Sequence, residues 1–218
     1  MKYRPILLAI MFPVVAAASE ADASSAELRV GGSIIPGGAC GVTVGDGLID
    51  LGRLKRDKLN ATTPTPLKEE KVRMDINCGS RSRYALAVSS TSHGASNHIL
   101  DFGLVSDPDH LPTGSLFIRF DNNATRMDGE NGYVTGTDEV ADLANAIWGP
   151  STGSIMPISN GRQVAGFVTS EGSSDTPSYV KDLYTTLLLY PQIRPLNELS
   201  LNDDIVFSTD VSFEIRYF

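Results

Sequence analysis

The stretch GPSTG (149–153) has the spacing G-x-S-x-G, which in α/β-hydrolases presents a serine nucleophile on a sharp turn between a strand and a helix. Such a serine needs a histidine as general base, and in those enzymes the histidine comes after the serine in the chain. Here all the histidines precede Ser151; they are His93, His98 and His110. Because this order is wrong for the chemistry, we expect that the protein is not an enzyme.

Two further sets of side chains raise the question of a metal site. The three histidines are five and twelve residues apart, which matches no standard zinc pattern. Four aspartates near turn-rich stretches suggest calcium; they are Asp107, Asp109, Asp121 and Asp128. In DNNATR (121–126), however, Arg126 stands where a calcium loop of the EF-hand type needs glycine. We therefore predict neither a metal nor a cofactor.

Trp148 and Tyr133 are the aromatic side chains that best suit a sugar-binding platform. Isolated aromatic residues of a β domain more often pack in the core or at its rim, because burying the ring is favourable. We expect this of both Trp148 and Tyr133. Carbohydrate binding is kept as an alternative function.

The composition bounds the kind of partner. The chain has 218 residues, of which 41% are hydrophobic, and this is enough for one domain with a packed core. It contains 18 Lys and Arg against 26 Asp and Glu, so the formal net charge is −8. Nucleic-acid binding needs a basic face for the phosphates, and this charge therefore argues against nucleic acid as a partner.

The elements that would position any site are predicted to be β-strands. Apolar residues recur at alternate positions in short runs separated by turn-forming residues, which is the strand pattern. The predicted strands cover 26–35, 47–54, 70–78, 83–90, 98–105, 114–121, 162–170, 184–193 and 204–218. Residues 121–132 and 169–178 are predicted to be turn-rich, and 138–148 is the one stretch with helical spacing. Many short strands joined by polar turns indicate a single all-β domain, a β-sandwich.

The first 23 residues have the pattern of an export signal. A short basic region precedes the apolar run 6–15, and small residues follow it. The apolar run is about half as long as a membrane-spanning helix needs. We therefore predict a signal peptide at 1–23, cleaved after Ala18 or Ala23.

The two cysteines, Cys40 and Cys78, both lie after this signal. In an oxidising compartment an even pair favours one disulfide over two buried thiols. Closing a loop of roughly 40 residues would stabilise the fold by about 4 kcal/mol in the chain-entropy model.

The two ends of the mature chain carry the most regular patterns. AELRVGGSII (26–35) alternates, with a glycine in the apolar register, and Cys40 follows soon after it. DIVFSTDVSFEIRYF (204–218) alternates up to the penultimate Tyr217, and Cys78 ends a strand between the two. This arrangement resembles the pilins of the chaperone–usher pathway of Gram-negative bacteria. It is most similar to a family of fimbrial-subunit-like proteins of formerly unknown function, through LRVGGSIIPGGAC, GLIDLGRL, KVRMDINC, FGLV, NGRQVAGF and VSFEIRYF.

The resemblance implies an immunoglobulin-like β-sandwich of the pilin type, incomplete because its last strand is missing. Residues 24–33 would be an N-terminal donor-strand extension, and 34–218 the pilin-like domain. The donor side chains would be Leu28, Val30, Gly32 and Ile34. The edge strand that receives a donor would present Val211, Phe213, Ile215, Tyr217 and Phe218.

The implied function is that of a structural subunit of a fimbrium on the cell surface, exported to the periplasm by its signal peptide. A periplasmic chaperone would first supply the missing strand, and the extension of the next subunit would replace it at an outer-membrane usher. Neighbouring fimbrial subunits and a host glycan or surface would be further partners. The sequence departs from the pattern at Ile205, fourteenth from the end, where such pilins commonly carry glycine. The alternative function is that of a tip adhesin or secreted carbohydrate-binding β-sandwich protein.

Overall fold

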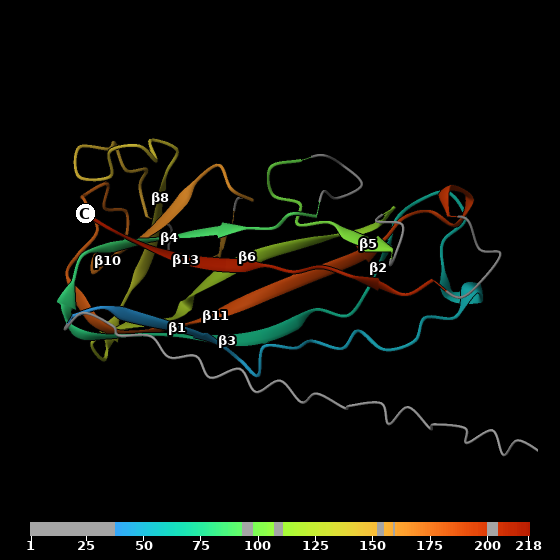
Figure 1. Cartoon of the computed structure of the whole chain (residues 1–218), viewed down its shortest axis with the longest axis horizontal. Coiled ribbons are helices and arrows are strands. Elements are labelled where there is room, and N and C mark those ends of the chain that lie inside the picture. Colours follow the sequence, from blue (N-terminus) through green and yellow to red (C-terminus); the bar gives the residue numbers. More distant parts are fainter. Residues whose placement is uncertain (1–37, 93–97, 107–110, 152–154, 159, 200–204) are drawn as a thin grey trace, which may run out of the picture. The chain divides into compact units, whose positions relative to one another are not determined.

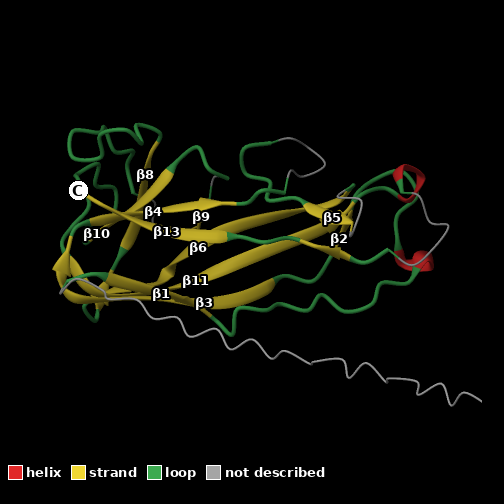
Figure 2. Cartoon of the chain, in the orientation of Figure 1, coloured by secondary structure: helices red, strands yellow, loops and turns green. Residues whose placement is uncertain are grey.

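Period-two alternation of apolar and polar side chains produces the long strand β3 (Glu70–Ser82), and the same pattern builds the rest of the fold. The structure is a computed structural model that describes residues 38–92, 98–106, 111–151, 155–158, 160–199 and 205–218, all within the compact unit Ile35–Phe218. This unit consists of two antiparallel sheets and two short 3-10 helices, η1 (Arg56–Lys58) and η2 (Leu196–Glu198) (Figures 1 and 2). The predicted all-β sandwich architecture is confirmed.

The larger sheet is organised around a long central strand, β11 (Val180–Ile193), which pairs antiparallel with β3 on one side and β6 (Pro112–Met127) on the other. The full order is β1 (Cys40–Val44), β3, β11, β6, β5 (Leu104–Ser106) and β12 (Phe207–Ser208). Three short strands pair beside this path: β2 (Thr65–Pro66) with β11, and both β7 (Glu130–Asn131) and β9 (Ile155–Pro157) with β6.

The smaller sheet has the order β13 (Ser212–Tyr217), β4 (Tyr84–Ser89), β10 (Val164–Val168) and β8 (Tyr133–Thr137). All of β10 is buried, and so is β4 except for its last residue. Strands buried on both faces read as continuous apolar runs, as they do here. The terminal strand β13 is far less buried.

The core lies between the two sheets. Met74 and Ile76 of β3 and Leu187 of β11 face Leu86 and Val88 of β4 across it. An aromatic cluster joins the sheets: the Phe167 ring lies 6.2 Å from the Tyr84 ring and 5.9 Å from the Phe120 ring, the second pair edge-to-face. Such pairs add about 0.5–1.5 kcal/mol beyond their buried area.

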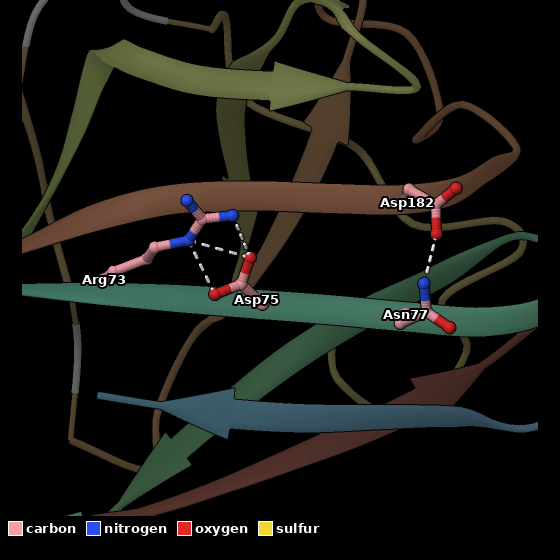
Figure 3. A network of polar contacts seen from close by, with 4 residues as sticks. All are labelled: Arg73, Asp75, Asn77 and Asp182. Carbon is pink, nitrogen blue, oxygen red and sulfur yellow. Dashed lines mark hydrogen bonds and ion pairs between the residues drawn. The ribbon is translucent and has the colours of Figure 1, made fainter. Parts of the chain in front are cut away.

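The outward face of the larger sheet carries a polar network on β3 and β11 (Figure 3). The Arg73 guanidinium donates to both Asp75 oxygens, with Nε–Oδ2 and Nη2–Oδ1 distances of 2.8 and 2.6 Å, and these bonds raise the pKa of Arg73. Asn77 on β3 donates a hydrogen bond to Asp182 on β11. The alternation predicted for 70–78 is therefore confirmed, and it fixes which face of β3 meets the core.

Residues 138–148 form turns, so the predicted helix is wrong. Asp142 accepts hydrogen bonds from the backbone and side-chain amides of Asn145, which favours a local turn. Leu143 and Trp148 pack instead on the outer face of the smaller sheet. Tertiary packing has outweighed the helical spacing.

The predicted turn over 121–132 begins too early, because β6 continues to Met127. Two of its polar side chains are buried and hydrogen-bonded: the Asn122 Oδ1 accepts the Val134 N–H at 3.1 Å, and the Thr125 and Thr185 hydroxyls are 2.6 Å apart. Residues 47–54, predicted to be a strand, form no ladder. The predicted strand 26–35 and the signal peptide lie outside the described residues.

Candidate functional site: an unpaired strand edge

The last strand of the chain is hydrogen-bonded on one side only. β13 pairs with β4 from Ser212 opposite Ser89 to Tyr217 opposite Tyr84. No other described strand pairs with β13. Its second edge therefore presents a row of backbone N–H and C=O groups that can accept another strand.

A second unpaired edge lies at β1, the outermost strand of the larger sheet. β1 pairs with β3 alone among the described strands. The last hydrogen bond to β3 is donated by the Gly45 N–H to the Arg73 carbonyl at 2.8 Å. Residues 46–55 follow it and form no strand. Two glycines with positive φ, Gly47 and Gly52, interrupt this stretch. Glycine adopts this conformation without strain, which explains why GLIDLGRL does not continue the sheet.

Apolar side chains of the two edges, of β12 and of the segment after η1 pack against the core but remain half-buried. We call them the apolar strip: Val42, Val44, Leu51, Leu59, Phe207, Val211, Phe213 and Ile215. Met74 and Leu86, which belong to the same core, are fully buried. The core is thus incompletely covered along the two unpaired edges.

The two edges meet at one end of this strip. The backbone N–H of Cys40 donates to the Tyr217 hydroxyl at 2.6 Å. Cys40 is bonded to Cys78, its direct partner on β3, so the predicted disulfide is confirmed. Opposite Tyr217 lies Tyr84, whose buried hydroxyl finds no hydrogen-bond partner among the described residues. Burial raises the pKa of Tyr84, and the nearby charge of Asp128 raises it further.

The final residue turns to the opposite face of the smaller sheet. The Phe218 ring stacks on the Trp148 ring, with centroids 5.8 Å apart and planes 19° apart. Trp148 is 2% exposed and lies directly against Gly166 of β10. The interpretation of Trp148 as a packed residue is confirmed, and its ring is covered, so it offers no platform for a sugar.

The structure places the predicted edge residues together. Val211, Phe213 and Ile215 lie on the apolar strip, Tyr217 is 50% exposed at its closed end, and Phe218 lies outside it. The predicted donor residues Leu28, Val30, Gly32 and Ile34 lie outside the described residues.

The alternative chemical sites receive no support from geometry. Ser151 is 5% exposed, and its hydroxyl donates to the Ser170 carbonyl at 2.9 Å. Asp128 accepts the N–H groups of Lys181 and Asp182, both at 2.9 Å, and pairs with Arg81 at 2.7 Å.

Of the three histidines considered as zinc ligands, only His98 lies in the described part of the chain, where its Nδ1 accepts the Leu100 N–H at 3.2 Å. The other residues considered as metal ligands and lying outside the described residues are His93, His110, Asp107 and Asp109. Across the described ranges, no three His, Cys, Asp or Glu side chains are grouped to hold a metal ion.

Sequence reasoning missed the β1 half of the strip. CGVTV (40–44) alternates and begins at the cysteine, so its pattern was sufficient to predict a strand with Val42 and Val44 on one face. The approach of β1 to β13 depends on tertiary packing and leaves no local signal.

No family model and no curated protein matches the chain. In the part of the chain that the structure describes, we find no helix with the length and apolar character required to span a membrane.

Proposed function

We propose that this chain is a structural subunit of a bacterial surface fimbria, assembled through a periplasmic chaperone and an outer-membrane usher by donor-strand exchange. The observation that carries the proposal is the apolar strip lying between two unpaired strand edges, those of β13 and of β1 with 46–55. An added strand would hydrogen-bond to the free edges and place alternate side chains on the strip.

The physical need for such a strand follows from the energetics of edges. Free strand edges beside incompletely covered apolar side chains favour aggregation unless they are covered. Covering the strip also removes apolar area from water, at about 25 cal/mol per Å². A donor strand therefore stabilises the subunit and joins it to its neighbour in one step.

The strand order supports an immunoglobulin-like assignment. In that sandwich one sheet has the order A-B-E-D and the other contains C, F and G. Here the larger sheet places β1, β3, β11 and β6 side by side, as A, B, E and D are in that fold, and these strands also come in the matching sequence along the chain. In the smaller sheet, β4 and β13 occupy the places of C and F. The place of G is beside β13, at the edge that no described strand pairs.

The predicted donor segment suits this place. Residues 24–33 carry Leu28, Val30 and Gly32 at alternate positions, and Ile34 continues the register. Alternate side chains of an added strand point to the same face, here toward the strip. A glycine among them permits a close approach to the receiving backbone.

The test uses a synthetic peptide of residues 24–35 and the mature chain, with hydrogen exchange read at β13. We expect the peptide to raise the thermal midpoint and to protect the β13 amides on the edge away from β4. A control peptide with Leu28→Asp and Val30→Asp should do neither. Monomeric two-state refolding to high stability without chaperone, in which the peptide protects no β13 amide, would contradict the proposal.

A further inference from the structure

Two loops at one end of the sandwich are acidic. Residues 138–147 and 169–178 contain no Lys or Arg. Their exposed carboxylates are Asp138, Glu139, Asp142, Glu171 and Asp175. We call these two loops the acidic end.

The acidic end lies where the described chain begins and ends. Loop 169–178 leads directly into Val180, the first residue of β11. The other loop leads into Trp148, which stacks on Phe218. The hydroxyl of the neighbouring Tyr217 accepts a hydrogen bond from the Cys40 N–H, so β1 starts at this same end. Figure 1 shows these loops beside the C-terminus.

The opposite end of β11 is basic. The sequence RLKRDK (53–58) carries four exposed cations and one carboxylate, and we call it the basic end. The basic end lies close to the residues that follow β11, because Asn60, just after this segment, accepts the Leu196 N–H with its carbonyl at 2.9 Å. β11 has 14 residues, which separates the two ends by about 45 Å of strand. η1 and the acidic loops accordingly lie at opposite ends in Figure 1.

The polarity of strand addition decides which ends meet. β13 runs from the basic end, where the preceding β12 pairs with β5, to the acidic end at Tyr217. A donor strand antiparallel to β13 would have its C-terminal residue near the basic end of the receiving copy. The five residues 35–39 then connect it to Cys40 of its own copy and span at most about 18 Å. The acidic end of the donor copy is thereby held against the basic end of the receiving copy.

On this basis, which rests on the proposed function, we infer that the acidic end of one copy docks on the basic end of the next copy of this chain. Charge complementarity selects the antiparallel donor orientation, since a parallel donor would bring two acidic ends together. Each charged surface also has an exposed apolar side chain: Ile147, 77% exposed, in the acidic end, and Leu54, 37% exposed, in the basic end. These side chains provide apolar contacts within the charged interface.

Charge changes at each end test the inference in the mature, full chain. Asp138→Lys with Glu171→Lys changes the formal charge of the acidic end from −5 to −1, and Lys55→Glu with Lys58→Glu changes that of the basic end from +3 to −1. Among the described residues, none of these four side chains makes a hydrogen bond or an ion pair, so the fold should persist. The association of refolded chains is followed by light scattering, and binding of the 24–35 peptide is measured in parallel.

At low salt we expect either pair of changes alone to slow association roughly tenfold, because rim charges act mainly on association rates. The variant changed at both ends keeps the net charge of wild type. It should associate faster than the basic-end variant, because an acidic end of −1 repels the altered basic end less than one of −5 does, but more slowly than wild type. All differences should shrink below about twofold at 0.5 M salt, where charges are screened. Peptide binding should remain the same in every variant.

If the peptide binds but variants changed at one end associate like wild type, or the variant changed at both ends associates no faster than the basic-end variant, the docking inference is wrong and donor-strand addition stands. If the peptide fails to bind wild type and leaves β13 unprotected, the proposed function itself is contradicted, and the docking inference is contradicted with it.

Discussion

The N–H of Cys40 donates a 2.6 Å hydrogen bond to the hydroxyl of Tyr217, a residue 177 positions away. This bond joins the outermost strands of the two sheets at the closed end of the apolar strip. It gives the penultimate aromatic residue a specific role within the fold, which is to hold the end of β13 against β1.

Tyr217→Phe is predicted to destabilise the fold by about 0.5–1 kcal/mol, since it removes one half-exposed hydrogen bond and leaves the ring. Denaturant unfolding measures this loss, and hydrogen exchange of the Cys40 amide should accelerate. Tyr179→Phe is the matched control, because the Tyr179 ring stays under Arg83 and its hydroxyl has no described partner. Equal stabilities of the two variants would show that the Tyr217 bond contributes nothing.

Phe218→Ala is predicted to expose the only tryptophan of the chain. Without the stacked ring the Trp148 indole gains contact with water, so its fluorescence should shift to longer wavelength, with a loss of about 0.5–1.5 kcal/mol. Phe218→Tyr keeps the ring stack and should keep the wild-type spectrum. An unchanged spectrum in Phe218→Ala would mean that other residues cover Trp148.

Much of the fold was predictable from local pattern. The alternation in 70–78 identifies β3 and its inward face, and two cysteines after a predicted export signal predict the disulfide. The alternation of the last residues likewise identified Phe213 and Ile215 of β13, with Val211 just before it, as one apolar face. These features depend on side-chain period, which the sequence carries directly.

The rest depends on contacts between distant segments. The polar run that continues β6 to Met127 looks like a turn until Thr185 and Val134 supply its hydrogen-bond partners. The helical spacing of 138–148 yields to packing on β10. The second half of the apolar strip needs β1 to approach β13, and no local pattern encodes this approach.

Gly166→Ala is predicted to destabilise the protein by about 1–3 kcal/mol through overpacking. A Cβ at this position would contact Pro177 closely and lie 2.7 Å from Cζ3 of the Trp148 ring. Gly41→Ala is the matched control on β1, where a Cβ meets nothing within 4 Å. Its stability should equal or slightly exceed that of wild type, because alanine reduces the entropy of the unfolded chain. Equal unfolding midpoints for the two variants would contradict the close packing of the loops on β10.

Tyr84 is predicted to make the fold sensitive to alkaline pH. Because burial raises the pKa of Tyr84 in the folded state above the ordinary tyrosine value of about 10, the folded chain holds this proton more tightly than the unfolded chain. The contribution to stability is therefore complete below pH 10 and is lost as the pH rises through the raised pKa.

Tyr84→Phe removes the titrating group, so the free energy of unfolding should fall less steeply above pH 10 than in wild type. At pH 7 the variant should be as stable as wild type or about 1 kcal/mol more stable, because a buried hydroxyl without a described partner is removed. Denaturant titrations between pH 7 and 11 measure both effects, with Tyr179→Phe as the exposed control. A variant less stable than wild type at pH 7, with the same alkaline slope, would show that the Tyr84 hydroxyl has a partner within the fold.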